Sequence, residues 1–501
     1  MTFLKNASPF LFSALAFAIL FRHGELGLNV FLFDAVVLIA ALWYRPELSK
    51  HRAFTWAVGG LLFSAGAVVI VHGPVSFLAH GISALLVLGF AQARELRFVW
   101  FGGLLGITSV FTGAARWQQL RDQPQGSASS AHHVPALRWL RQSLIPLLIA
   151  LPFFALYALA SEQFGAIFGE LSRFKIFSRL WWDTLTFFLR FGLGALIITP
   201  LFLLAQRPSV LLEIAATFRD QLPRRHLERT KRPFFSPIAL KEEYRRGVLT
   251  FAVLNLLLAI VNAMDLRYVW MSSEDLSAAT LSQYVHAGTY SLICSILLAM
   301  VVVLYFFRGN LNFYTRGEWL GPLARLWIAQ NALLAVSVGW RNYHYIRKYG
   351  LAEGRILVVF VLLLLLFGLL TLFRKVRHKL SVTYLLQANG LAVWFALLLF
   401  GAINWPGVIT RYNLAATTRS EVDLYYLTHG LPGDNTFLLL QSEVINYIDL
   451  PYRKRRDAIS APKSWRSWNY ADWRNIRAHK IHRAKFPVIK RDNPDTQPWT
   501  D

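Results

Sequence analysis

The stretch Ile356–Phe373, ILVVFVLLLLLFGLLTLF, is an apolar run that contains no charged residue and no proline. A helix of about 20 apolar residues spans the hydrocarbon core of a bilayer, which is roughly 30 Å thick. Backbone polar groups in lipid must be satisfied within the segment itself, which favours a helix. This run is therefore predicted to be a transmembrane helix.

The rest of the chain repeats this pattern. Hydrophobic residues make up 55% of the 501 residues and charged residues 16%, whereas soluble domains contain about a quarter charged residues. The composition excludes a string of soluble domains and predicts an all-α polytopic transmembrane helix bundle. About twelve spans are expected, at Ala7–Phe21, Leu28–Tyr44, Ala53–Val71, Val75–Ala91, Phe98–Ala115, Leu144–Ala160, Phe187–Ala205, Val248–Met264, Thr289–Phe307, Leu323–Trp340, Ile356–Phe373 and Gly390–Trp405.

Loop charge predicts the orientation of the bundle. The net charge is +24, and in a membrane protein such an excess is typical of loops that face anionic headgroups on the cytoplasmic side. In the later part of the chain, successive connections fall on alternate sides of the membrane. The connections on one side carry 20 basic residues in total and those on the other side carry 8. This excess places residues 206–247 and 374–389 in the cytoplasm. The early basic loops Arg45–Arg52 and Gln92–Arg97 disagree, because alternation puts them on the other side. Either one early segment does not cross the membrane, or these charges are outvoted by the others.

Two segments outside the lipid are long enough to have partners. Residues 206–247 combine an amphipathic pattern with a basic cluster that is expected to contact anionic headgroups, namely Arg224, Arg225, Arg229, Lys231 and Arg232. Nucleic acid is disfavoured as a partner because no binding module accompanies the charge. Residues 406–501 form a small helical extramembrane segment, with short helices predicted at Glu421–His429 and Thr436–Tyr447, before a basic, Trp-rich tail. This segment is expected to contact the membrane surface or a protein partner.

Charged and polar side chains within spans are candidate functional residues. Asp183 and Arg190 are seven residues apart and share a helix face, whereas Asn255, Asn262 and Asp265 form a polar stripe on another predicted helix. These residues could line a ligand or ion path. Alternatively, Asp183 lies at headgroup level and the stripe only packs helices together through hydrogen bonds.

Other patterns indicate packing rather than chemistry. Gly102 and Gly106 form a GxxxG motif, which is typical of close helix packing. No Walker loop, GxSxG, HExxH, CxxC or EF-hand loop occurs, and His72 and His80 have too few partners in the sequence for a catalytic or metal site. No cofactor, metal or catalytic residue is therefore predicted.

Short motifs beside the spans resemble a bacterial multi-pass membrane family, domain of unknown function 4173. They are Leu20-Phe21-Arg22, Gly27-Leu28-Asn29, Leu240–Tyr244, Leu254–Leu257, Asn262–Asp265, Tyr284–Tyr290, Tyr305–Tyr314, Trp327–Asn331, Arg341–Tyr343, Tyr349–Leu351, Asn404-Trp405 and Tyr412-Asn413. The resemblance implies a bacterial inner-membrane protein and supplies no reaction, substrate or cofactor. It draws attention to His286, Asn331 and Asn342, and His286 and Asn331 are added to the candidate ligand or ion path.

These observations divide the chain into six regions. Residues 1–115 and 144–205 hold transmembrane helices, and residues 116–143 form a flexible basic linker between them. Residues 206–247 are the basic cytoplasmic loop, 248–405 the family-like transmembrane core, and 406–501 the extramembrane segment with its tail.

The sequence leaves three functions open. The favoured one is a non-enzymatic membrane component of signalling or assembly that presents residues 406–501 to another protein. The second is a transporter or channel with a polar intramembrane site. The third is a membrane-embedded enzyme acting on lipid, for which only His286 near Asp265 offers acid or base chemistry.

Overall fold

The computed structural model describes most of the chain and shows a helical protein. Described residues are 2–22, 25–93, 98–112, 179–203, 213, 219–222, 237–267, 289–314, 317–416, 422–442, 445, 450–459 and 464–486. Within these ranges the chain forms helices and turns, and its one β-type pairing is an isolated bridge between Gln221 and Leu380. The predicted all-α fold is confirmed.

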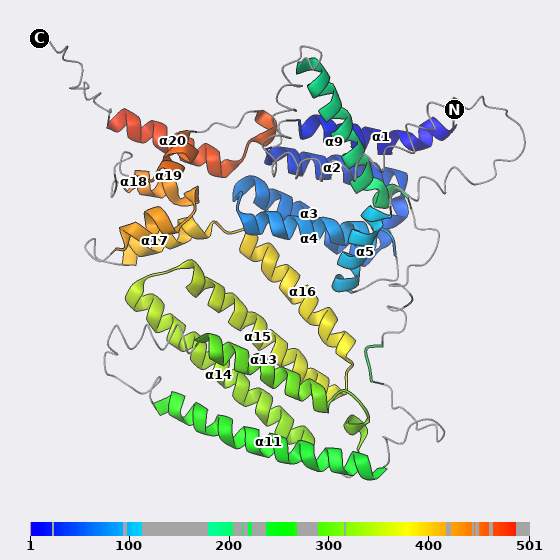
Figure 1. Cartoon of the computed structure of the whole chain (residues 1–501), viewed down its shortest axis with the longest axis vertical. Coiled ribbons are helices and arrows are strands. Elements are labelled where there is room, and N and C mark those ends of the chain that lie inside the picture. The colour runs from blue at the N-terminus through cyan, green and yellow to red at the C-terminus, as the bar shows by residue number, and fades with distance from the viewer. Residues whose placement is uncertain are drawn as a thin grey trace, which may run out of the picture.

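The first helices pack together as an N-terminal group (Figure 1). The group consists of α1 (Thr2–Leu20), α2 (Leu28–Tyr44), α3 (Arg52–Ile70), α4 (Pro74–Phe90), α5 (Val99–Phe111) and α9 (Arg179–Phe202). Their shared core contains Phe54, Leu86 and Ile198, each 1% exposed. Helices α3 and α4 are joined by three residues only and so form a tight hairpin.

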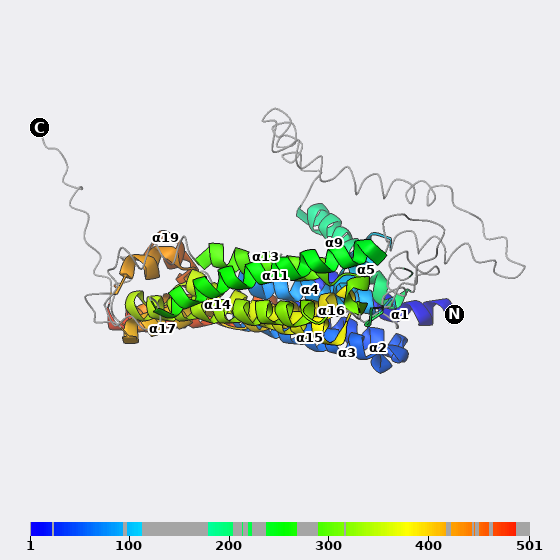
Figure 2. The same ribbon diagram turned by 90° about the horizontal axis from the view of Figure 1, so that it is seen from below.

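A second group of helices has its own core (Figure 1). It consists of α11 (Pro237–Asp265), α13 (Thr289–Phe306), α14 (Leu320–Tyr349) and α15 (Glu353–His378). Because α13 returns the chain between them, α11 and α14 run in the same direction, and Figure 2 shows them side by side. The apolar run Ile356–Phe373 forms the middle of α15.

Helix α16 (Val382–Gly401) connects the two groups. Its residue Leu385 belongs to the second core, whereas Trp394 and Leu398 belong to the N-terminal core. The helix begins earlier than the predicted span Gly390–Trp405, because the hydroxyl of Ser381 accepts a hydrogen bond from Tyr384 N at 3.2 Å and caps its first turn.

The C-terminal segment forms a third unit at one end of the bundle (Figure 1). It consists of α17 (Trp405–Ala416), α18 (Thr436–Gln441), α19 (Tyr452–Ile459) and α20 (Tyr470–Lys485). The helix predicted at Glu421–His429 is represented by a short turn of π-helix at Tyr426–Gly430, and α18 ends at Gln441, earlier than the predicted Tyr447. This unit packs back on the bundle, since Leu28 N of α2 donates to the carbonyl of Trp468 at 2.9 Å.

The described helices support fewer membrane spans than the twelve that were expected. Five are long and apolar enough to cross a bilayer, namely Arg52–Ile70, Asp183–Phe202, Leu240–Asp265, Glu353–His378 and Val382–Gly401. Five further apolar helices are shorter, at Ser8–Leu20, Leu28–Tyr44, Pro74–Phe90, Val99–Phe111 and Tyr290–Phe306. The predicted span Leu144–Ala160 lies outside the described residues.

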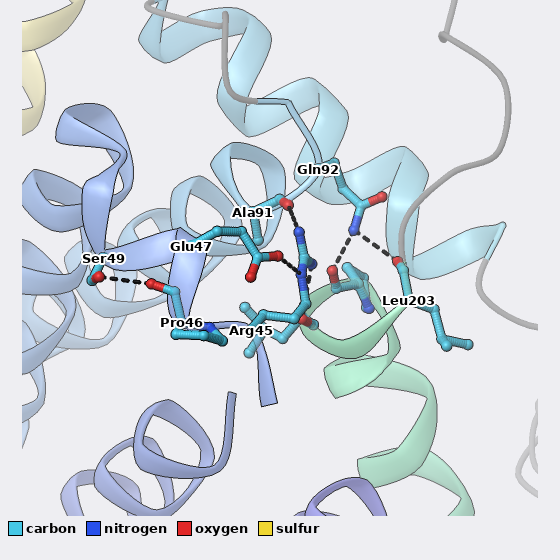
Figure 3. Close-up of polar contacts among 9 residues, drawn as sticks. Arg45, Pro46, Glu47, Ser49, Ala91, Gln92 and Leu203 are labelled. Atoms are coloured by element: carbon cyan, nitrogen blue, oxygen red, sulfur yellow. Dashed lines mark hydrogen bonds and ion pairs between the residues drawn. The ribbon is translucent and has the colours of Figure 1, made fainter. Parts of the chain in front are cut away.

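Arg45 joins three helix ends (Figure 3). This buried side chain donates to the carbonyls of Ala91 and Leu201, each at 3.0 Å, and pairs with Glu47 at 3.1 Å. A cation at helix C-termini is stabilised by the unpaired carbonyls and by the helix dipole. The ends of α2, α4 and α9 therefore lie together.

The same end of the bundle holds the start of α16. Trp100 near the start of α5 donates to Leu386 O at 3.1 Å, and Ser381 N donates to Asp220 O at 2.8 Å. The loop Arg45–Arg52, together with Gln92, thus lies at the end that also carries the 374–389 connection. Strict alternation of twelve spans would put Arg45–Arg52 on the opposite side, so this arrangement favours the alternative that one segment does not cross.

Glycines allow α4 and α5 to approach closely. A Cβ on Gly106 would overlap the carbonyl of Leu85, and one on Gly89 would overlap the carbonyl of Gly102. A Cβ on Gly102 would meet the ring of Phe90 at 2.9 Å. The packing role predicted for the GxxxG motif is confirmed.

Candidate functional site

Three polar side chains of the N-terminal group meet between apolar helices. Nδ1 of His80 in α4 lies 3.7 Å from Oδ2 of Asp34 in α2 and 3.4 Å from the hydroxyl of Ser64 in α3. Ser64 also donates to its own helix at Leu61 O, at 2.8 Å. Asp34 and Ser64 are buried, and Asp34 Oδ2 has no hydrogen-bond partner among the residues that the structure describes.

The three residues lie at one depth in the bundle. Asp34 and His80 each stand six residues after the first residue of their helices, and Ser64 stands six residues before the end of the antiparallel α3. At a rise of 1.5 Å per residue, each is about 9 Å from the same end of the bundle. A carboxyl and an imidazole at this depth in apolar helices are costly to ionise separately, which makes the pair a candidate proton site.

This cluster was not among the predicted sites. Asp34 is the only carboxylic acid in Leu28–Tyr44. An acid inside a predicted span indicates a candidate functional residue, so Asp34 could have been found from the sequence. His80 was set aside because its partners lie 16 and 46 residues away in the sequence, and only the packing of α2, α3 and α4 brings them together.

A second polar seam runs between α11 and α14. The side-chain amide of Asn255 donates to Phe251 O at 2.7 Å and to Leu323 O at 3.0 Å. Its Oδ1 accepts a hydrogen bond from Gln330 Nε2 at 2.7 Å. Asn255 therefore serves mainly to pack the two helices together.

Further along the seam, some polar atoms have no hydrogen-bond partner in the described part of the chain. Asn262 donates to Gln330 O at 3.2 Å, and Asp265 forms an ion pair with Arg341 of α14. Oδ1 of Asn262, Oε1 of Gln330 and Oδ2 of Asp265 are buried without a hydrogen-bond partner. The stripe Asn255, Asn262 and Asp265 faces the bundle, as its spacing predicts.

The remaining predicted site residues are not part of this seam. Asn331 is buried and donates to Trp327 O in its own helix at 2.8 Å, whereas its neighbour Gln330 faces α11. Asp183 and Arg190 line a pocket in the N-terminal group and are not joined to the stripe. The candidate His286 and the basic cluster Arg224, Arg225, Arg229, Lys231 and Arg232 lie outside the described residues.

Several residues of the quoted motifs hold helix ends in place. Asn342 donates to Arg355 O at 3.0 Å across the α14–α15 turn, and Asn404 donates to Asp434 O at 3.1 Å. These contacts are structural and involve no reactive group. Among the described residues, no group of three or more His, Cys, Asp or Glu side chains is placed to hold a metal ion.

Long apolar helices with ionisable groups buried between them define a multi-pass α-helical membrane protein. The family model described as Domain of unknown function (DUF4153) matches residues 53–439, well over half of the chain. The chain therefore belongs to that family. The searches of curated proteins and of solved structures each return no match.

The resemblance to domain of unknown function 4173 is thus wrong, because the matching family is a different one. The match begins at Ala53 and includes α3 to α5, where the quoted motifs are absent. Asn342 and Asn404, which belong to the quoted motifs, fix turns between helices.

Proposed function

We propose that this protein is a membrane transporter whose cycle is coupled to protonation of the Asp34–His80 pair. The observation that carries the proposal is the position of these two groups, 3.7 Å apart and buried between α2 and α4. One proton on the pair gives either two neutral groups or an ion pair. Loss of that proton leaves a net negative charge among apolar helices, at considerable cost.

This cost links proton loss to a change in structure. A buried charge is tolerated once water or a counter-charge reaches it, and that requires the helices around Asp34 to move. Because Ser64 on α3 donates its hydroxyl proton to Leu61 O, its oxygen is placed to accept a hydrogen bond from His80 when Nδ1 carries a proton. Proton binding and release would thus favour two different arrangements of α2, α3 and α4.

Proton movement in proteoliposomes tests the proposal. The full chain is reconstituted with a trapped pH-sensitive dye, and a potassium diffusion potential is imposed. We expect internal acidification faster than in protein-free liposomes, and loss of this excess rate for Asp34→Asn. Ser76→Ala is the matched control, because it removes a buried hydroxyl of α4 that bonds only locally, to Gly73 O at 2.6 Å. Equal rates for wild type and Asp34→Asn would overturn the proposal.

The unpartnered oxygens of the α11–α14 seam support a polar solute path as part of the same function. Asn262 Oδ1 and Gln330 Oε1 are buried acceptors for which no described residue supplies a donor. Asn262→Leu should therefore reduce transport while the protein stays inserted and folded. Under a purely structural role it should only lower stability, by about 1 kcal/mol.

A second candidate function is an assembly role for residues 406–501. Tyr425, Tyr452 and Trp465 of this segment are 74%, 71% and 63% exposed. Such aromatic residues next to basic ones fit a membrane interface or a partner protein. Cross-linking in cells from a photoreactive residue at Tyr452, with Asp472 as a control position on α20, would detect a partner. Labelling by lipid alone would exclude a protein partner at this face.

We also propose that the chain has about twelve spans in a bacterial inner membrane, with the Arg45 end in the cytoplasm. Arg45, Lys50 and Arg52 lie at the same end as Arg374, Lys375, Arg377 and Lys379, in accord with a cytoplasmic excess of basic residues. The basic residues of 206–247 would then contact anionic headgroups there. Reporters fused after Glu47 and after Lys379 should share a compartment, and one after Asn413 should report the opposite side.

A further inference from the structure

A pocket of about 280 Å³ opens where α1, α9 and the C-terminal unit meet. Three arginines from distant parts of the chain line it, namely Arg22 after α1, Arg190 of α9 and Arg466 of the 3₁₀ turn Trp465–Ser467. One acid, Asp183, lies among them, and Arg22 pairs with it at 3.5 Å. Three arginines and one aspartate give the lining a net charge of +2.

Hydrogen bonds hold Arg190 and Arg466 in place. These bonds leave some guanidinium N–H groups without a partner among the described residues. Arg190 donates to Thr186 O at 2.8 Å, to the hydroxyl of Thr186 at 2.7 Å and to Arg22 O at 2.6 Å. Arg466 donates to Ile19 O at 3.0 Å, whereas its Nε is buried without a hydrogen-bond partner. A guanidinium has five N–H donors, and these contacts use only some of them.

The surroundings of the pocket are apolar. Ile19 and Phe187 form part of its lining, and Leu15, Phe188 and Leu189 are exposed on the same two helices. Asp183–Phe202 is long and apolar enough to cross a bilayer, so Asp183 marks the edge of a span. A pocket at this level lies at the height of lipid headgroups, next to helix faces that acyl chains cover.

We propose that this pocket binds a phosphate group, and that an anionic phospholipid carries it. Planar guanidinium groups bind phosphate oxygens in bidentate geometry, and three of them converge here. The exposed apolar faces of α1 and α9 would receive the acyl chains. Because Arg466 belongs to the C-terminal unit, the bound lipid would also fasten that unit to α1 and α9, beside the contact of Leu28 with Trp468.

Lipid titration of the purified full-length protein tests the site. Short-chain phosphatidylglycerol, short-chain phosphatidylcholine and inorganic phosphate are added in detergent, and binding is measured by native mass spectrometry and by the shift in Tm. We expect phosphatidylglycerol to bind and to raise Tm more than phosphatidylcholine, whose choline cation offsets the phosphate charge. Arg466→Gln should weaken this binding about tenfold or more, as expected for the loss of a charge-assisted hydrogen bond.

Arg477→Gln is the matched control, since Arg477 is exposed on α20 and does not line the pocket. If Arg466→Gln lowers the Tm of the ligand-free protein, Arg22→Gln provides the same test, because the Arg22 side chain is 59% exposed. Inorganic phosphate that binds with the same arginine dependence, without preference for lipid, would overturn the lipid assignment. Equal binding by wild type and both pocket variants would overturn the phosphate site itself.

Discussion

Asn413 of α17 binds both backbone polar groups of Leu351. Its Oδ1 accepts a hydrogen bond from Leu351 N at 2.6 Å, and its Nδ2 donates to Leu351 O at 2.9 Å. Leu351 follows Gly350, which has a φ of 74° and whose Cα faces the Asn413 amide so closely that a Cβ would meet it at 2.6 Å. This one side chain therefore fixes the α14–α15 turn to the C-terminal unit.

Asn413→Leu should destabilise this junction. The substitution leaves the N–H and the C=O of Leu351 without partners, and an unsatisfied buried polar group costs about 1–3 kcal/mol. We expect a lower Tm of the purified protein, followed by tryptophan fluorescence in detergent. Tyr412→Leu, at the more exposed neighbouring position, should leave Tm almost unchanged. Equal effects of the two substitutions would contradict the role given to Asn413.

Gly106→Leu should separate α4 from α5. The added side chain has no space, because even a Cβ would overlap the carbonyl of Leu85. Small residues allow membrane helices to pack closely, and overpacking of a tight interface costs about 1–3 kcal/mol or more. Gly103→Leu is the matched control, because nothing lies within 4 Å of a Cβ there. Pairs of cysteines across the α4–α5 interface should cross-link in the control and not in Gly106→Leu.

Asp265→Asn should leave Arg341 as an uncompensated buried charge. The two side chains are 11% and 15% exposed, and removal of one partner from a buried pair costs about 3–5 kcal/mol. The double variant Asp265→Asn/Arg341→Gln should lose less stability than the sum of the two single variants. Additive losses in denaturant unfolding would show that the ion pair contributes no coupling energy.

Much of the helical layout could be predicted from hydropathy alone. The bounds predicted for Leu28–Tyr44 coincide with those of α2, since apolar runs that are uninterrupted by polar residues mark helices directly. Helix ends were harder to place where polar side chains continue the helix. Thus α14 extends past Trp340 to Tyr349, because Asn342 and Tyr345 are buried against neighbouring residues.

The polar sites could be predicted only in part. The stripe of α11 was visible because its members share one helix at helical spacing. Its partner on α14 is Gln330 and not Asn331, since adjacent residues on a helix differ by about 100° in direction and the sequence does not fix which of them faces α11. Asp34, Ser64 and His80 belong to three helices, so their proximity depends on packing that the sequence pattern does not reveal.

The C-terminal unit should become more stable as the pH rises above 8. Lys454 is buried and donates to Leu427 O at 2.8 Å and to Asn435 Oδ1 at 2.6 Å. Burial lowers the pKa of Lys454 from 10.5 to about 8. Below pH 8 both the folded and the unfolded chain carry the charge, so the desolvation cost is present in full.

Between pH 8 and 10.5 the unfolded chain binds more protons at Lys454 than the folded chain does, and the free energy of unfolding therefore rises with pH. The neutral amine still has two N–H groups for its two acceptors. Thermal unfolding of the full chain at pH 7, 8, 9 and 10 should show this gain in wild type, relative to Lys454→Met, which cannot titrate. Lys480→Met on the exposed side of α20 is the control and should follow wild type. Parallel curves for wild type and Lys454→Met would mean that the buried amine does not titrate in this range.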